Sequence, residues 1–107
     1  AQRTLDVVTS DNGMPFPRAK VNLYEPGVHM PLAIRWPERF GGGRRITDFV
    51  SHVDFAPTLL EAAGVAAPTD IDGRSLLPLL DTPVPDPRRE RYARFLIAEQ
   101  NGALEQP

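Results

Sequence analysis

The sequence predicts a mixed α/β fold, in which short strands and short helices alternate and long proline-containing connections join them. The 107 residues include 12 prolines, and an interior proline removes a backbone donor and fixes φ, so an all-helical bundle is disfavoured. Apolar strand-like runs alternate with segments of helical spacing, which is typical of an α/β layer rather than a sandwich. The length suits one domain and allows roughly two thirds of the unfolded surface to be buried.

Composition and charge exclude several classes of function. The chain has no cysteine, which excludes disulfides, thiolate metal sites and a cysteine nucleophile. Its formal net charge is -2, and the absence of a basic run disfavours nucleic acid or an anionic membrane as a partner. No apolar run approaches the roughly 18 residues of a membrane span, and the first residues lack the apolar core of a signal peptide. We therefore expect a soluble protein with no nucleic-acid and no membrane partner.

The first half of the chain predicts strands separated by a long loop. Residues 5–9 are rich in β-branched side chains and stop at the turn sequence 10–13, so they predict a short buried strand. Residues 14–30 contain prolines and no periodicity, which indicates a loop. A second strand is expected at 31–37, with a proline at each end. Residues 44–50 predict a third, weaker strand.

One helix is clearly predicted in the second half. Asp54 is a good N-cap, and Pro57 lies in the first turn, where its missing amide costs little. Gly64 follows as a natural C-terminal stop. Apolar residues recur between these points at helical spacing, so one face of the helix is expected to be buried; they are Phe55, Leu59, Ala62 and Ala63.

The remaining segments predict a short helix, a linker and one ambiguous element. Ser75 is expected to cap a helix at 76–80. Residues 81–91 carry three prolines in alternation, which is typical of an extended linker. Residues 92–98 fit either a strand or a helix, and their apolar run favours a strand.

Asp11 and Asn12 are candidate metal ligands because they follow directly after an apolar strand. The carboxyl ends of strands in open α/β sheets face the ligand crevice, and a carboxylate with an amide oxygen suits calcium or magnesium. The alternative is an ordinary turn, in which Asp11 accepts a local backbone hydrogen bond. Two oxygen donors also fall short of the about six to eight that calcium takes.

Charged residues in the loop after this turn are candidate substrate contacts. Arg18 and Lys20 lie where a cation near a metal would bind an anionic substrate oxygen, although a loop lysine is more often simply solvated. His29 is either a site residue or a structural histidine. A catalytic triad at Ser51, His52 and Asp54 is rejected, because adjacent strand residues point to opposite faces and cannot pair as nucleophile and base.

Five segments occur in a fixed order along the chain: 10–13, Lys20 with 24–28, 31–37, 50–60 and 72–80. Together they resemble the C-terminal half of a sulfatase catalytic domain. The segment 14–20, and Pro26 where many sulfatases have glycine, resemble the heparan N-sulfatase (sulfamidase) branch.

The resemblance implies an alkaline-phosphatase-like layered sheet with flanking helices, and hydrolysis of sulfate esters or sulfamates at a calcium site. The family's Asp-Asn calcium ligands correspond to Asp11 and Asn12, and its catalytic, sulfate-binding lysine corresponds to Lys20. Arg18 and His29 match no family motif and are substrate-binding candidates by position alone. The implied substrate is a sulfated carbohydrate, or a small sulfate ester or sulfamate.

The chain also departs from the family. Sulfatases use a formylglycine made from Cys or Ser in a C/S-x-P-S-R motif, together with a further acidic calcium pair, and neither occurs here. We therefore expect a fragment that is inactive alone. Residues 1–80 would form the C-terminal part of the catalytic domain, 81–91 a linker, and 92–107 the start of a C-terminal subdomain. Apolar faces exposed by truncation would favour self-association.

Two alternatives follow from the same residues. In the first alternative, the parent protein is a phosphodiesterase or phosphonate monoester hydrolase of the same superfamily, because such enzymes partly share the Asp-Asn turn and the downstream segments. Otherwise, the chain is a non-catalytic binding module that keeps part of the fold.

Overall fold

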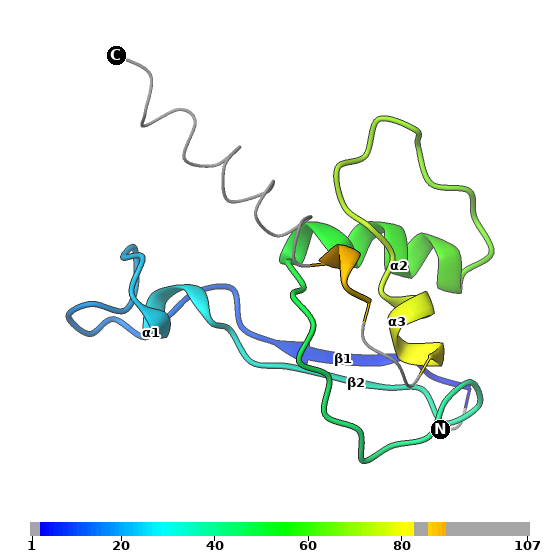
Figure 1. The fold of residues 1–107 in the computed structure, drawn as a ribbon, viewed down its shortest axis with the longest axis horizontal. Coiled ribbons are helices and arrows are strands. Elements are labelled where there is room, and N and C mark those ends of the chain that lie inside the picture. Colours follow the sequence, from blue (N-terminus) through cyan, green and yellow to red (C-terminus); the bar gives the residue numbers. More distant parts are fainter. Residues whose placement is uncertain (1–2, 83–85, 90–107) are drawn as a thin grey trace. The chain divides into compact units, whose positions relative to one another are not determined.

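The computed structural model describes residues 3–82 and 86–89, which form a mixed α/β structure with two strands and short helices (Figure 1). The chain divides into two compact units, Ala1–Gly43 and Arg44–Pro107, and each is described by itself. None of the described helices is long and apolar enough to cross a membrane. The predicted strand at 92–98 lies outside the described residues.

The first unit is built on a two-stranded antiparallel sheet. Strand β1, Asp6–Thr9, pairs with β2, Leu32–Arg35, so that Asp6 lies opposite Arg35 and Thr9 opposite Leu32. Both predicted strands are therefore confirmed, each slightly shorter than expected. The Asp6 and Arg35 side chains form an ion pair at 3.1 Å across the end of the ladder.

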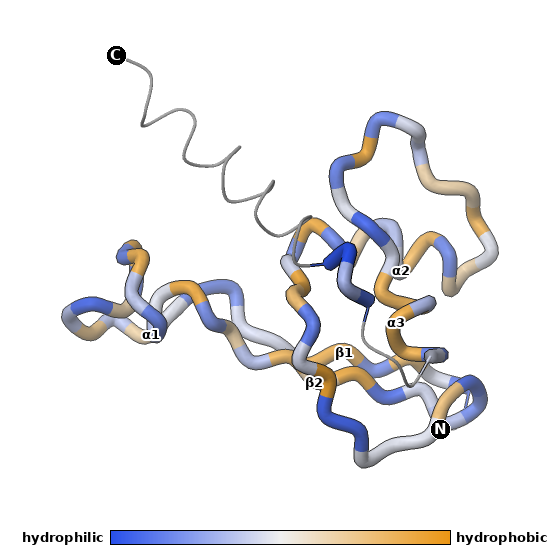
Figure 2. Tube along the Cα trace, in the orientation of Figure 1, coloured by the Kyte–Doolittle hydropathy of each residue, from blue (hydrophilic) through white to orange (hydrophobic). Residues whose placement is uncertain are grey.

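The expected burial of the first strand is wrong. Hydrophobic residues gather on the paired strands (Figure 2), yet Val8 is 67% exposed and Val7 is only partly covered. Strand pairing with β2 satisfies backbone groups but does not bury either face of β1 completely. Burial of a strand depends on what packs across its faces, which a pattern of β-branched residues does not specify.

The segment between the strands contains one short helix in a region expected to be a loop. Helix α1, Glu25–Val28, has four residues, and Pro26 lies in its first turn, where the missing amide is tolerated. Turns and bends account for most of the residues from Asp11 to Tyr24.

The predicted strand at 44–50 is wrong, because this stretch is irregular. Its polar side chains bind backbone groups from elsewhere in the second unit. The Arg44 guanidinium donates to the carbonyls of Leu80 and Thr82, both at 2.7 Å, and Asp48 accepts a hydrogen bond from the backbone amide of Asp86 at 2.7 Å. A run with β-branched and aromatic residues does not make a strand unless it pairs with a partner strand.

Helix α2, Phe55–Ala62, confirms the position of the helix predicted in the second unit. Its predicted buried face is wrong, because Leu59 is 51% exposed and the buried residues of α2 are Pro57 and Thr58. Gly64 follows the helix with φ of 73°, the left-handed conformation in which glycine commonly ends a helix.

The start of α2 differs from expectation, because a 3-10 turn, η1 (His52–Asp54), precedes α2. The Asp54 carboxylate accepts a hydrogen bond from the Ser51 amide at 3.0 Å. It therefore caps η1 and makes no side-chain cap to α2.

The second unit has a small apolar core on helix α3, Leu77–Asp81. Leu76, Leu77 and Leu79 are buried, and α3 contacts α2. Ser75 lies just before the N-cap residue Leu76, and its hydroxyl accepts a hydrogen bond from the Leu77 amide at 3.2 Å. The predicted helix at 76–80 is thus confirmed, shifted by one residue.

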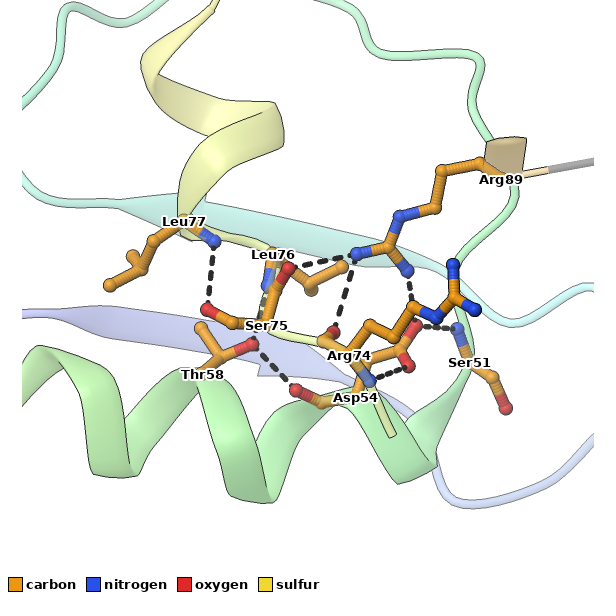
Figure 3. Close-up of polar contacts among 8 residues, drawn as sticks. All are labelled: Ser51, Asp54, Thr58, Arg74, Ser75, Leu76, Leu77 and Arg89. Atoms are coloured by element: carbon orange, nitrogen blue, oxygen red, sulfur yellow. Dashed lines mark hydrogen bonds and ion pairs between the residues drawn. The ribbon is translucent and has the colours of Figure 1, made fainter. Parts of the chain in front are cut away.

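A buried polar network joins η1, α2 and the segment that leads into α3 (Figure 3). The Asp54 carboxylate is fully buried and accepts from the Arg74 amide at 3.0 Å and from Arg89 Nη1 at 2.9 Å. Arg89 Nη2 also donates to the Ser75 carbonyl at 2.8 Å. Arg89 lies in the stretch predicted as a linker, and this side chain is anchored in the second unit.

A hydroxyl completes this network. Thr58 is buried and donates through its Oγ1 to the Asp54 carbonyl one turn earlier in the helix. The same oxygen accepts a hydrogen bond from the Leu76 amide at 2.8 Å. One threonine therefore ties α2 to Leu76, the N-cap residue of α3.

Candidate functional site

Asp11 and Asn12 lie in a turn at the end of β1. The strand ends at Thr9, and the Ser10 hydroxyl donates to the Asn12 carbonyl at 2.9 Å, which closes the turn. Asn12 Nδ2 donates to the Gly13 carbonyl at 2.8 Å. This bond occupies the nitrogen of the amide and leaves Oδ1 available as a ligand. Asp11 is exposed, and its carboxylate has no hydrogen bond or ion pair within the described ranges.

The loop after this turn folds back on itself and carries Lys20. The Phe16 amide donates to the Met14 carbonyl at 2.8 Å, and the Lys20 amide donates to the same oxygen at 3.0 Å. The Lys20 backbone thereby returns to within hydrogen-bond distance of Met14, two residues after Asn12. Lys20 is the only lysine in the 107 residues, and it is exposed.

Three segments of the first unit meet at Gly13. A Cβ built on Gly13 would lie 2.4 Å from the Pro26 carbonyl oxygen and 3.2 Å from the carbonyl carbon of Ala19. Gly13 directly follows Asn12, and Ala19 directly precedes Lys20. The fold therefore brings the Asp11–Asn12 turn, the loop with Lys20 and the start of α1 into contact.

Arg18 and His29 contact other residues. The Arg18 guanidinium lies 5.6 Å from the centroid of the Tyr24 ring, a distance suited to a cation–π interaction. His29 Nδ1 hydrogen-bonds to the Glu25 carboxylate, and both side chains are about three-quarters exposed. Within the described part of the chain, no hydrogen bond or ion pair links either residue to Asp11 or Lys20. Their role in substrate binding stays a prediction.

The turn offers the type of ligand that a hard cation binds, but too few ligands to complete its coordination shell. A carboxylate and an amide oxygen are ligands that calcium takes, but calcium needs about six to eight oxygens. Across residues 3–82 and 86–89, no group of three or more His, Cys, Asp or Glu side chains is arranged to hold a metal ion. Asp11 and Asn12 can therefore serve as part of a calcium shell, and they do not make one.

Comparison with known proteins connects this arrangement to a family. Residues 18–102 match the family described as N-sulphoglucosamine sulphohydrolase, C-terminal. This match covers most of the chain. The chain belongs to this sulfatase family. Lys20, Arg18 and His29 lie inside the matched region, and the Asp11–Asn12 turn precedes it.

Individual sulfatases are similar over much of the same chain. Arylsulfatase K from Xenopus laevis is 46% identical over 82 residues, which is 73% of this chain and 15% of the relative. Human N-sulphoglucosamine sulphohydrolase is 38% identical over 88 residues, covering 73% of this chain and 18% of the relative. N-acetylglucosamine-6-O-sulfatase from Bacteroides thetaiotaomicron is 38% identical over 96 residues, covering 86% of this chain and 17% of the relative. The sulfatase chain thus spans less than a fifth of the length of these relatives.

Sequence reasoning missed the residues that bring the segments of this sulfatase chain together. Gly13, Ala19 and Gly27 carry no chemistry of their own and were not singled out. Their only signal is small size, and small residues in a loop usually indicate turns rather than close backbone contact. The contact between them appears only when the loop is seen folded back on the turn.

Proposed function

We propose that the complete protein is a sulfatase that hydrolyses sulfate esters or sulfamates of sulfated carbohydrate. In this proposal Asp11 and Asn12 are calcium ligands and Lys20 binds the sulfate group, while the formylglycine nucleophile and further ligands lie outside the 107 residues. The chain alone is inactive. The observation that carries the proposal is the contact at Gly13, which brings the Asp-Asn turn against the loop that carries the only lysine.

The residues of this chain would act on the sulfate through charge. The Lys20 ammonium would donate to a sulfuryl oxygen and stabilise the negative charge that develops on the leaving group, an oxygen in a sulfate ester or a nitrogen in a sulfamate. Asp11 would contribute a carboxylate oxygen, and Asn12 its Oδ1, to the cation. Bound calcium would supply positive charge to polarise the sulfuryl group.

The names of relatives support a carbohydrate substrate. The human relative is named for N-sulphoglucosamine, and the Bacteroides relative for the 6-O-sulfate of N-acetylglucosamine. Other relatives are named steryl-sulfatases, so the class of sulfate monoester or sulfamate is better supported than the sugar.

An assay of the complete protein tests the reaction class. We expect a kcat/KM for aryl sulfate at least about tenfold higher than for an aryl phosphate diester, because the site is proposed to be built for the sulfuryl group. The Asp11→Ala variant should lose most activity with both substrates. A preference for the phosphate diester would instead support the phosphodiesterase alternative.

A calcium titration of residues 1–107 alone tests the incomplete shell. Two protein ligands should give binding no tighter than about 1 mM, the weak end for protein calcium sites. Isothermal titration calorimetry of this chain and of its Asp11→Ala variant measures the difference. Micromolar binding that Asp11→Ala abolishes would show that the chain holds a complete site and would contradict the proposal.

A further inference from the structure

We propose that Gly13, Ala19 and Gly27 form a positioning element, here termed the glycine junction, that holds Lys20 beside the Asp11–Asn12 turn. The inference rests on the proposed function, because it assigns the junction a purpose through Lys20. None of its three residues has a side chain that can bind or react. Their contribution is to let three backbone segments approach more closely than larger residues allow.

The junction has no room for side chains at its two glycines. A Cβ on Gly27 would lie 2.1 Å from the Ala19 carbonyl oxygen and 2.2 Å from that of Asn22. A Cβ on Gly13 would lie 2.4 Å from the Pro26 carbonyl oxygen. All of these atoms are backbone, so no side-chain rotation can relieve the overlap.

Space rather than backbone conformation therefore requires glycine at both positions. Neither Gly13 nor Gly27 has positive φ, whereas Gly43 and Gly64 do. Ala19, between them, is 3% exposed and is the only buried hydrophobic residue among the described residues of the first unit. The junction is thus the packed centre of a unit that is otherwise largely exposed.

The backbone on both sides of Ala19 and Lys20 is strained. Arg18 has φ of 61° and Val21 has φ of 66°, the left-handed region that non-glycine residues avoid and β-branched residues avoid most. Val21 is 93% exposed, so contacts of its own side chain do not compensate. Such strain persists only where the surrounding structure enforces it.

The strained backbone and the close packing at the glycine junction both fix the position of Lys20. Within the described ranges the Lys20 side chain makes no hydrogen bond or ion pair, so its position is set by the backbone that carries it. That backbone is fixed by the Met14 carbonyl on one side and by the junction on the other. Enlarging either glycine would push the loop, and Lys20 with it, away from the Asp11–Asn12 turn.

A double-mutant cycle in the complete protein tests the inference. We expect Gly27→Ala to lower kcat/KM for aryl sulfate by on the order of 10- to 100-fold, because small displacements of a positioned group cost that much. Gly27→Ala added to Lys20→Ala should cost no more than about threefold further, since the junction acts through Lys20. An equal loss in both backgrounds would reduce Gly27 to a general structural role and overturn the inference.

If the Gly27→Ala variant does not fold, the Val21→Gly variant tests the same inference. The substitution introduces no clash and relaxes the loop, so the melting temperature should stay or rise while kcat falls. Limited trypsin digestion after Arg18 gives a readout independent of activity, and cleavage should be faster than in wild type. Gly41→Ala, at a position with nothing within 4 Å of the added Cβ, is the matched control.

The outcomes separate the two proposals. If Lys20→Ala does not change activity, the proposed function fails, and the digestion alone judges whether the junction restrains the loop. If Lys20→Ala abolishes activity while Val21→Gly changes neither kcat nor cleavage, the proposed function stands and the glycine junction is overturned.

Discussion

Replacing Arg89 by methionine is expected to lower the free energy of unfolding by about 3 to 5 kcal/mol, the usual cost of removing one partner of a buried ion pair. Asp54 is fully buried, and the Arg89 side chain is nearly so. Methionine keeps much of the apolar stem but leaves the Asp54 carboxylate without its cation. The Arg74 and Ser75 carbonyls lose a donor at the same time.

Chemical denaturation of residues 1–107 measures this change, with Arg88→Met as the matched control. Arg88 is the neighbouring arginine, its side chain is 82% exposed, and it pairs with Asp86. The Arg88 side-chain hydrogen bond lowers the pKa of the Asp86 carboxyl, but an exposed pair of this kind contributes little to stability. Equal effects of the two substitutions would contradict a buried anchor at Arg89.

The same network predicts that an apolar replacement of both partners will not restore stability. Exchanging a buried ion pair for hydrophobic residues is often neutral or stabilising. Here the Asp54 carboxylate also accepts from the Ser51 and Arg74 amides, and Asp54→Leu would leave both without an acceptor. Unsatisfied buried amides cost about 1 to 3 kcal/mol each.

Local signals predicted the helical part of this unit well. Pro57 and Gly64 mark the start and the end of helix α2 to within a few residues. They could be recognised in the sequence because the hydrogen bonding and φ angles at helix ends depend on nearby residues. The partner of Asp54 was out of reach of such reasoning, because Arg89 lies 35 positions away. An arginine that closely follows a proline-rich run is typical of an exposed linker, and only tertiary structure places it against a buried carboxylate.

Non-local features explain the errors as well. Residues 44–50 have apolar side chains suited to a strand, but Arg44 instead binds the carbonyls at the end of α3. In the first unit the strand positions were predicted correctly and the burial of β1 was not. Pairing and coverage depend on distant segments, which the composition of a short run does not specify.

The sequence predicted some residues of the candidate site better than others. The Asp-Asn turn after a strand was placed by the pattern alone, and the structure has it at the end of β1. The residues alone favoured a solvated role for Lys20, and the family resemblance gave it a function. The folded loop adds what neither supplied, namely the return of Lys20 to the turn through the Met14 carbonyl and the glycine junction.

Lys20→Ala in the complete protein is expected to lower kcat/KM for aryl sulfate by on the order of 10²- to 10³-fold, the usual cost of removing one preorganised group that stabilises developing charge. The loss should appear mainly in kcat, because the ammonium is proposed to bind the leaving oxygen more strongly as its charge grows. Folding should be unaffected, since Lys20 is exposed and its side chain makes no hydrogen bond or ion pair among the described residues.

Two further variants separate position from charge. Lys20→Arg keeps the positive charge but replaces a compact ammonium by a planar guanidinium, so activity should recover only in part. Arg45→Ala removes an exposed cation from the second unit and should leave kcat/KM within about twofold, because Arg45 has no part in the proposed site and an exposed charge is strongly screened by salt. If Arg45→Ala reduces activity as much as Lys20→Ala, the effect belongs to net charge, and Lys20 has no specific place in the site.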